Sequence, residues 1–272
     1  ELDPLFISRV GQDPLGLKVR NSMREWGMSV EGLEEDADHP TGQVKVTLKH
    51  GEPTYEIVPE QAYDYIRCEA LSAGKVPRNA LLYHGTLATR GSTSRGSLKR
   101  LLSAGLARFV DVNLRAPWWA KEDVRALIRG AAAVKVNGDE LRKLSSSDGR
   151  LEALAAGLQQ ELNIPALIVT LGEEGAFVRL SGGAIHRVEA PRPAPFVDAV
   201  GAGDAFSAIV IRGILGGWEW SVTLTRAASF AAQVCQWRGA FRNDRDVYRA
   251  IQAREIDGTK QTQQTRPLHR TS

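Results

Sequence analysis

Short apolar runs alternate along the chain with longer stretches in which apolar residues recur every three or four positions. The clearest runs have strand length and occupy residues 81–83, 109–112, 133–136 and 167–170. The stretches between them have helical spacing, at residues 94–104, 121–130 and 151–162. Such alternation predicts parallel strands with crossover helices on both faces. The expected fold class is therefore α/β with a mainly parallel sheet.

A different pattern precedes these elements. Residues 43–49 and 54–57 alternate polar and apolar side chains, and His50-Gly51-Glu52-Pro53 lies between them. This predicts an antiparallel pair of strands, which we interpret as a small β lid over about residues 41–58. Further helices are predicted after residue 206, at about residues 221–237 and at residues 244–253, and a strand at residues 176–180.

Composition limits the classes of protein that fit. A chain of 272 residues can form one large α/β domain, which we expect over residues 1–256, whereas the polar residues 257–272 are predicted to be disordered. The 35 basic and 32 acidic residues give a net charge of +3 without a basic stripe, which gives no support for nucleic acid as a partner. Cys68 and Cys235 have no metal-site spacing. No apolar run is long enough to span a bilayer, and we expect a cytoplasmic protein.

The most informative segment is Asp198-Ala199-Val200-Gly201-Ala202-Gly203-Asp204-Ala205-Phe206, which runs into an apolar, helix-like stretch. Backbone N–H groups at the start of a helix lack intrahelical acceptors and attract anions such as phosphate. Gly201 and Gly203 would let a phosphate approach the backbone closely. Asp204 would repel it unless the carboxylate had a separate task, such as orienting and deprotonating an attacking hydroxyl. The alternative is a tight turn that caps a helix.

Two other phosphate-binding motifs fit poorly. A dinucleotide fingerprint requires a third glycine where this chain has Phe206, and it belongs in an early βαβ unit. A Walker loop around Gly74-Lys75 is excluded because Glu69 replaces its first glycine and Val76 replaces its Ser or Thr.

The segment closely resembles the second signature of the PfkB (ribokinase-like) family of carbohydrate kinases, Asp-Thr-x-Gly-Ala-Gly-Asp-x-Phe, with Ala199 in place of Thr. The resemblance runs to about residue 255 and implies a ribokinase-like fold that uses ATP and Mg²⁺. It implies that Asp204 is the catalytic base and that Gly201, Ala202 and Gly203 form an anion hole. It also implies a candidate monovalent-cation (K⁺) site at Asp198 and the carbonyl of Val200.

Three polar motifs follow predicted strands: Asn113-Leu114-Arg115, Asn137-Gly138-Asp139-Glu140 and Thr170-Leu171-Gly172. Ligands of open parallel sheets bind beyond the carboxyl ends of the strands, so these motifs are expected to share one crevice.

Asn137 and Glu140 have the spacing of a capping box, which would be a structural role. They are also similar to the family's Asn-x-x-Glu motif, which implies that they help to hold Mg²⁺ and its waters near the nucleotide phosphates, Glu140 through water. We favour the functional interpretation because the Asp204 motif is present.

Residues 170–175 are similar to the family's Thr-Leu-Gly-x-x-Gly, which implies nucleotide contacts for Thr170, Gly172 and Gly175. The alternative is an ordinary strand, turn and strand. Arg115 falls in a pattern similar to Asp-x-Asn-x-Arg-x-x-x-Trp of fructokinase and ketodeoxygluconate kinase relatives. It could neutralise the transferring phosphoryl group or bind an acidic sugar, or it could be a surface arginine paired with an acid. His84 is expected to be a hydrogen-bonded histidine at a strand end.

The predicted activity is ATP-dependent phosphorylation of a sugar hydroxyl, with fructose or a related ketose as the leading substrate and ketodeoxygluconate or another sugar or nucleoside next. A non-catalytic sugar- or nucleotide-binding relative is the alternative from another class, and a scaffold without a ligand comes third. Residues 10–16 resemble the family's Val-Gly-x-Asp-x-x-Gly, but the Gly-Gly-rich first sugar motif does not precede them. We therefore expect the chain as written to bind ATP and to phosphorylate sugar poorly. A homodimer through the lid is a candidate assembly.

Overall fold

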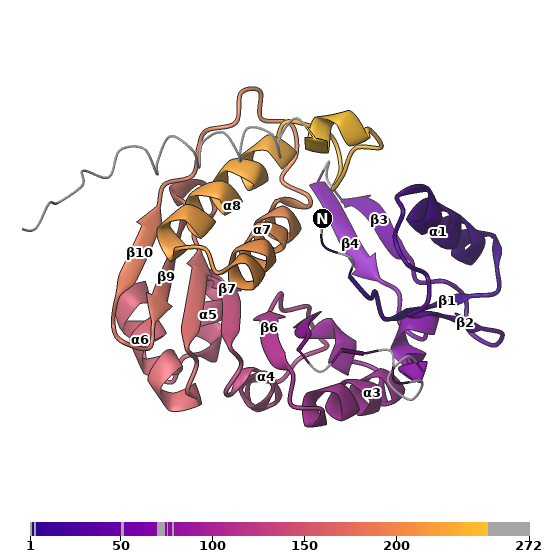
Figure 1. Ribbon diagram of the computed structural model, residues 1–272, viewed down its shortest axis with the longest axis horizontal. Coiled ribbons are helices and arrows are strands. Elements are labelled where there is room, and N and C mark those ends of the chain that lie inside the picture. Colours follow the sequence, from indigo (N-terminus) through magenta and orange to yellow (C-terminus); the bar gives the residue numbers. More distant parts are fainter. Residues whose placement is uncertain are drawn as a thin grey trace, which may run out of the picture. The chain divides into compact units, whose positions relative to one another are not determined.

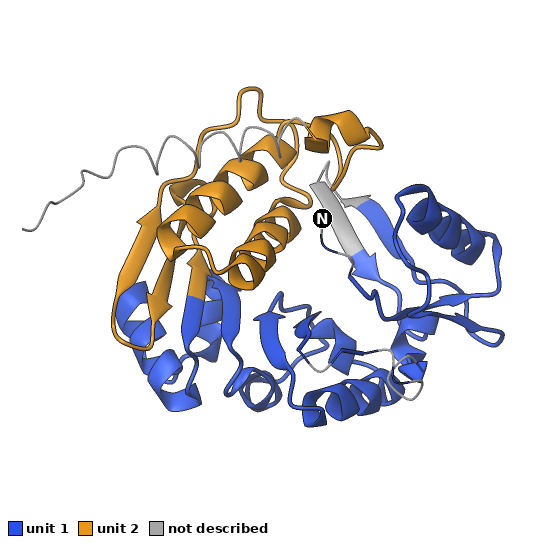
Figure 2. Ribbon diagram, viewed as in Figure 1, with its two compact units in different colours: residues 1–167 blue, residues 168–272 orange. Residues whose placement is uncertain are grey.

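The computed structural model describes residue 2 and residues 4–249, apart from residues 50, 51, 70–73, 75 and 78. The chain divides into two compact units, Glu1–Leu167 and Ile168–Ser272 (Figure 2). The boundary falls inside one strand, β8 (Ala166–Thr170). Each unit is described by itself.

The first unit contains a βαβ segment, a hairpin and an alternation of strands and helices (Figure 1). Its elements are β1 (Ser8–Gly11), α1 (Pro14–Glu25), β2 (Leu33–Asp36), β3 (Val44–Lys49), β4 (Glu52–Ile57), η1 (Ala62–Tyr65), β5 (Leu81–Gly85), η2 (Leu87–Thr89), α3 (Ser92–Ser103), β6 (Ala107–Asp111), α4 (Lys121–Ile128), β7 (Ala133–Asn137), α5 (Gly138–Leu144) and α6 (Leu151–Leu162). The predicted strands and helices of this region are confirmed, and α6 has the predicted bounds.

The βαβ segment begins where Asp13 caps α1. The Asp13 carboxylate accepts the N–H of Gly16, and Pro14 occupies the first helical position, where its missing N–H does no harm. Strands β1 and β2 pair in parallel. The cap of α1 also accepts the N–H and the hydroxyl of Thr41, so one carboxylate joins the helix start to the segment that leads into β3.

A buried ion cluster lies on β1 and β2. The Arg9 Nε donates to Asp36 Oδ2 at 2.6 Å and its Nη1 donates to Glu34 Oε2 at 3.2 Å. Burial by itself would raise the pKa of Asp36. Hydrogen bonds from the N–H of Asp38 and from the Arg9 guanidinium outweigh this effect and lower the pKa to about 2. The carboxylate therefore stays ionised at neutral pH, as a buried acid opposite an arginine should.

The predicted lid hairpin is present as β3 and β4, which pair antiparallel with Val44 opposite Ile57. Strand β4 starts at Glu52, so Glu52 and Pro53 belong to the strand and not to the bridge expected from the sequence. Proline is tolerated there because β4 has a single pairing partner in its sheet and its other edge needs no donor. The other two bridge residues lie outside the described residues.

The long sheet has the strand order β10-β9-β8-β7-β6-β5. Strands β5, β6 and β7 pair in parallel, whereas β10 pairs antiparallel with β9. The sheet is therefore mixed. Parallel strands are buried on both faces, and accordingly Phe109, Val110 and Val134 are inaccessible to solvent. In α6, the residues Leu154, Leu158 and Leu162 recur every fourth position and form its buried stripe.

The second unit contains a pair of helices and a small group of strands. Its elements after β8 are η3 (Gly172–Glu174), β9 (Ala176–Leu180), β10 (Ile185–Val188), α7 (Ala202–Gly216) and α8 (Trp220–Val234). Helix α8 lies beside α7 and packs on β9 and β10 (Figure 1). Residues 245–249 are helical, so the helix predicted at residues 244–253 starts one residue later, and residues 250–253 lie outside the described residues, as does the tail at residues 257–272. The predicted single domain stays a prediction.

His84, near the end of β5, is only 8% exposed. Its Nδ1 lies 3.2 Å from the carbonyl of Gly85, but its Nε2 has no partner in the described part of the chain. The expectation of a fully hydrogen-bonded histidine is therefore wrong for Nε2. Burial lowers the pKa of His84 from 6.5 to about 4, because a charged ring would be poorly solvated there.

The stability of the protein should therefore fall as pH decreases from 7.5 to 5. Between these values the unfolded chain binds a proton at His84 and the folded chain does not, so the unfolded state gains about 2 kcal/mol. Chemical denaturation at both pH values should show this loss in the wild type and in His186→Gln, a control at a less buried histidine. His84→Gln should remove it. A His84→Gln variant with unchanged pH dependence would show that this ring is not the source.

Candidate functional site

The predicted anion-binding turn lies at the start of α7. Gly201 is the N-cap, with φ +84°, and α7 begins at Ala202. A Cβ atom at position 201 would lie 2.6 Å from the Cα of Ala240, which no real side chain could tolerate. Glycine is thus required here by the backbone conformation and by close packing.

Asp198 shapes the same turn. Its Oδ1 accepts the N–H of Val200 at 3.0 Å, and its Oδ2 accepts the N–H of Gly239 at 3.1 Å. These backbone donors lower the pKa of Asp198. This geometry gives Asp198 a structural role, because its carboxylate holds the turn before Gly201. A carboxylate with backbone carbonyls nearby is also the kind of oxygen donor set that suits a hard monovalent cation.

Asp204 stands in the first turn of α7, where it is exposed, and the next residues, Ala205 and Phe206, are buried and anchor the helix. The N–H of Ala202 donates to the Ala199 carbonyl at 3.2 Å, so this amide already has an acceptor inside the turn. Gly203, next along the helix, is exposed and has no side chain to block access to its amide. The helix start thus offers accessible backbone and a carboxylate beside each other.

The predicted nucleotide loop, residues 170–175, belongs to the same unit. Gly172 and Gly175 both have positive φ, at +63° and +103°. A Cβ atom at Gly175 would lie 2.0 Å from the Val188 carbonyl, whereas one at Gly172 would meet nothing within 4 Å. Packing against the end of β10 explains Gly175. Gly172 opens onto free space, so its surroundings leave room for a ligand, and Thr170 ends β8 just before it.

In the first unit, Asn137 and Glu140 form the capping box that their spacing allows. Asn137 Oδ1 accepts the N–H of Glu140, and Glu140 Oε2 accepts the N–H of Asn137, both at 2.9 Å. The other oxygen, Glu140 Oε1, accepts the N–H of Leu114 at 2.8 Å. The carboxylate, only 6% exposed, therefore joins two of the predicted motifs.

A buried ion pair lies below these two motifs. Lys135 Nζ donates to Asp111 Oδ2 at 2.5 Å, and the two residues are register partners on β7 and β6. Asn113 follows β6 with φ +43°, a left-handed conformation that asparagine adopts more readily than most residues. Arg115 is exposed and has no ion pair with any described residue, which does not favour the surface ion pair considered as its alternative.

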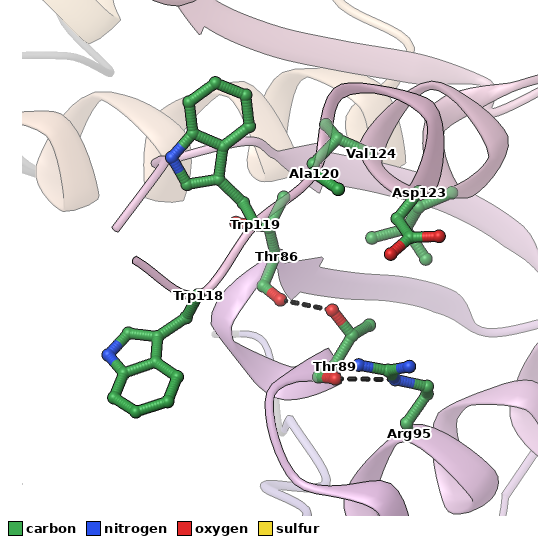
Figure 3. Close-up of a pocket in the computed structure, with 9 residues that line it drawn as sticks. Thr86, Thr89, Arg95, Trp118, Trp119, Ala120, Asp123 and Val124 are labelled. Atoms are coloured by element: carbon green, nitrogen blue, oxygen red, sulfur yellow. Dashed lines mark hydrogen bonds between the residues drawn. The ribbon is translucent and has the colours of Figure 1, made fainter. Parts of the chain in front are cut away.

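The first unit also contains a pocket whose lining differs from the residues described above. Figure 3 shows its lining, with Trp118 and Trp119 pointing in different directions from the segment after β6. The 3-10 turn η2 forms another wall, where Thr89 donates to the Thr86 carbonyl and accepts from Arg95 through its own carbonyl. The lining includes none of the predicted site residues, so the pocket lends no support to the site.

The donor atoms decide which metals the described residues could hold. No group of three His, Cys, Asp or Glu side chains that could bind a metal directly is found among them. Each Glu140 oxygen accepts one backbone N–H and keeps capacity for a second hydrogen bond, so a water-mediated role beside Mg²⁺ fits, whereas direct coordination fits less well.

The sequence matches the pfkB family of carbohydrate kinases over residues 2–245, and the chain belongs to this family. It is 31% identical over 222 residues to a fructokinase of Klebsiella pneumoniae, a match that covers 78% of this chain and 71% of that protein. A fructokinase of Escherichia coli is 29% identical over 221 residues, or 77% of this chain and 70% of that protein. The predicted class of enzyme, a carbohydrate kinase, is confirmed.

Solved structures show the same fold. An aminoimidazole riboside kinase of Salmonella enterica, complexed with aminoimidazole riboside and an ATP analogue, has a TM-score of 0.71 and 25% identity. A fructokinase of Vibrio cholerae with fructose, ADP and calcium has a TM-score of 0.69 and 25% identity, and each match covers 86% of this chain and 80% of the other. The predicted ribokinase-like fold is confirmed. No helix within the described ranges has the length and apolar character to cross a membrane.

The structure thus joins some of the predicted residues and leaves others for proposal. In the first unit it links the Asn137–Glu140 motif to the loop that carries Arg115. In the second it joins Asp198, Val200 and Gly201 in one turn at the start of α7. That the two sets form one site stays a prediction. Sequence patterns did not reveal the amides of Leu114 and Gly239, because backbone donors carry no residue signature.

Glu140→Gln should destabilise the protein because a buried carboxylate that accepts two backbone N–H groups would be replaced by an amide that can accept only with one end. The expected loss in the free energy of unfolding is about 1–3 kcal/mol. Asp139→Asn makes the same charge change on the exposed side of the same helical turn and should cost less than about 0.5 kcal/mol. Denaturant titration of both variants checks this, and equal losses would refute the role given to the Glu140 carboxylate.

Proposed function

We propose that this chain phosphorylates a sugar hydroxyl with ATP and that fructose or a related ketose is the substrate. The observation that carries the proposal is the start of α7, where Asp204 stands beside accessible glycine backbone in a helix start. Asp204 is exposed there, so its carboxylate is accessible to a substrate. Membership of the pfkB family supports the reaction class.

In the proposed mechanism, Asp204 accepts a hydrogen bond from the sugar hydroxyl and takes its proton as the hydroxyl oxygen attacks the γ-phosphorus of ATP. The bond from the γ-phosphorus to the bridging oxygen breaks, and ADP leaves. The backbone amides of Gly201 and Gly203 stabilise the negative charge that accumulates on the transferring group, and Ala202, whose N–H donates to the Ala199 carbonyl, keeps the turn of this anion hole in shape. Because the first-turn amides are fixed by the helix, this stabilisation requires little reorganisation. Catalysis then depends on positioning and on fixed dipoles.

The nucleotide would be held by Thr170 and Gly172, where Gly172 leaves open space, and Gly175 would keep the loop in place through its packing on β10. Arg115, exposed and without an ion pair among the described residues, would neutralise the phosphoryl group or contact the sugar. Mg²⁺, when bound, neutralises phosphate charge, and Asn137 and Glu140 would hold its waters. A K⁺ ion would use Asp198 and the Val200 carbonyl. The proposed location is the cytoplasm, where ATP is available.

Fructose is favoured because the two relatives described above are fructokinases, and one similar structure contains fructose. Ketodeoxygluconate and nucleosides are the other candidates, and the likeness to an aminoimidazole riboside kinase keeps nucleosides open. An ATP-consumption assay of the protein over a panel of ketoses, aldoses, sugar acids and nucleosides tests the substrate. Higher turnover with a nucleoside than with fructose would overturn the assignment.

Asp204→Asn should lower kcat by about 10²–10⁴-fold, because a positioned general base contributes this much. Calorimetric titration should show that ATP binding is largely retained, since the carboxylate is not expected to hold the nucleotide. Asp139→Asn, an exposed first-turn aspartate on α5, serves as the control and should keep full turnover. Near-wild-type turnover of Asp204→Asn would mean that another group takes the proton.

The hairpin supports a proposal about assembly. A two-stranded hairpin is marginally stable alone, and on β3 the side chains of Val44 and Val46, which share one face, are 54% and 58% exposed. We propose that this face packs against the same face of a second copy of the chain, so that the protein is a homodimer through the lid. This would remove an apolar patch from water.

Val46→Glu should therefore convert a dimer to a monomer in sedimentation experiments at micromolar concentration, because it puts a charge into an apolar contact. Thr47→Glu introduces the same charge on the opposite, exposed face of β3 and should remain dimeric. A wild type that sediments as a monomer would refute the assembly.

A further inference from the structure

Arg90, which follows η2, is the most heavily bonded side chain of the first unit that no motif singles out. Its guanidinium makes a two-pronged contact with the Asp64 carboxylate, with Nε to Oδ1 at 2.9 Å and Nη2 to Oδ2 at 2.7 Å. The side chains of Arg90 and Asp64 are 4% and 5% exposed. A charge so well buried requires a partner of this kind, because an unpaired one would be strongly disfavoured.

The same guanidinium holds the exit of the hairpin. Its Nη1 donates to the carbonyl of Ile57, the last residue of β4, at 3.2 Å, and its Nη2 donates to the carbonyl of Val58 at 3.1 Å. The hydroxyl of Tyr63 donates to the Val58 carbonyl at 2.6 Å and accepts from Arg90 Nη2 at 2.9 Å. The chain therefore leaves β4 in a fixed direction.

Arg90 also contacts the segment after β6. Its guanidinium carbon lies 5.0 Å from the ring centre of Trp118 and 5.1 Å from that of Tyr63, so the charge is held against two aromatic faces. The N–H of Trp118 donates to the carbonyl of Arg115 at 2.8 Å, which closes the turn from Arg115 to Trp118. A planar guanidinium is suited to both tasks, whereas a lysine ammonium could not make the two-pronged contact with the carboxylate.

We propose that Arg90 is a positioning residue that fixes the turn carrying Arg115, through Trp118, relative to the base of the β3–β4 hairpin. This inference rests on the proposed function for its catalytic consequence, since Arg115 is there assigned to the phosphoryl group or the sugar. Its structural content does not depend on that function. The contacts of Arg90 with Ile57, Val58 and Trp118 lie within one unit.

The structural arm of the test is amide hydrogen exchange in the wild type, in Arg90→Lys and in Arg95→Lys. Arg95 is a matched control, since it is an exposed arginine on the same stretch of chain and its side chain bonds, among the described residues, only the Thr89 carbonyl. Arg90→Lys should speed exchange at Val58 and at Trp118 by about tenfold or more while amides in α6 keep their rates, as expected for local opening. Unchanged exchange at Trp118 would overturn the proposal, whether or not any sugar is phosphorylated.

The kinetic arm separates positioning from a general loss of stability. Arg90→Lys should lower kcat/KM for the sugar by about 10-fold or more, because a small misplacement of a substrate-contacting group is costly, and should leave KM for ATP unchanged. In an Arg115→Ala background the same substitution should have little further effect, since the group that it positions is gone. Trp118→Phe should retain most activity, as an aromatic face remains. Additive effects of the Arg90 and Arg115 substitutions would show that Arg90 does not act through Arg115.

If the wild type phosphorylates no sugar while exchange at Val58 and Trp118 still depends on Arg90, the proposed function fails and the positioning role stands. If the wild type is active and Arg90→Lys changes neither exchange nor kcat/KM, the positioning role alone fails.

Discussion

The ion pair between Asp111 and Lys135 sets the geometry on which the predicted site of the first unit depends. Its two residues are each about 6% exposed and are register partners on neighbouring parallel strands. A slip of one residue would turn one charge to the other face of the sheet and leave its partner buried without compensation, which is strongly unfavourable. One site motif begins at Asn113, two residues after Asp111, and the other begins at Asn137, two residues after Lys135. The hydrogen bond from Leu114 to Glu140 then joins the two motifs. The strand register that this ion pair fixes therefore also fixes where Arg115 and Asn137 lie, at the carboxyl ends of the strands.

Much of the fold could be predicted because its signals are local. Strand-length apolar runs and helical spacing located β5 to β9 and the helices α3, α4 and α6, and the stripe of α6 was clear enough to give its bounds. Strand β2, and with it the parallel pairing of β1 and β2, was missed for a physical reason. Strand β2 reads Leu33-Glu34-Glu35-Asp36, a pattern typical of a solvated acidic segment. The guanidinium of Arg9 and the backbone N–H groups of Arg67 and Glu69, all distant in sequence, make burial of Glu34 and Asp36 favourable.

The candidate site also has features that could be predicted from the sequence and features that could not. The turn before Asp204 carries a motif whose glycines and carboxylate have distinct tasks, so its residues could be named from the sequence. For Asn137 and Glu140 the sequence allowed a capping box and a metal-associated role, and the structure shows that the box is formed and that a water-mediated role is compatible with it. The bond from Leu114 to Glu140 and the contacts of Arg90 could not be foreseen. They join segments about thirty residues apart through backbone atoms and aromatic faces, which leave no pattern in one sequence.

The packing of Gly201 against Ala240 also affects the order in which the protein can be completed. The turn at residues 198–203 needs Gly239 to donate to Asp198, and it lies against Ala240. On a ribosome, these two residues emerge only after α7 and α8, and therefore after the whole first unit has been made. The nascent chain can thus form its strands and most of its helices while the helix start that bears Asp204 is still unfinished. A chain cut between α8 and Gly239 would be mostly folded and yet lack the contacts that shape this turn.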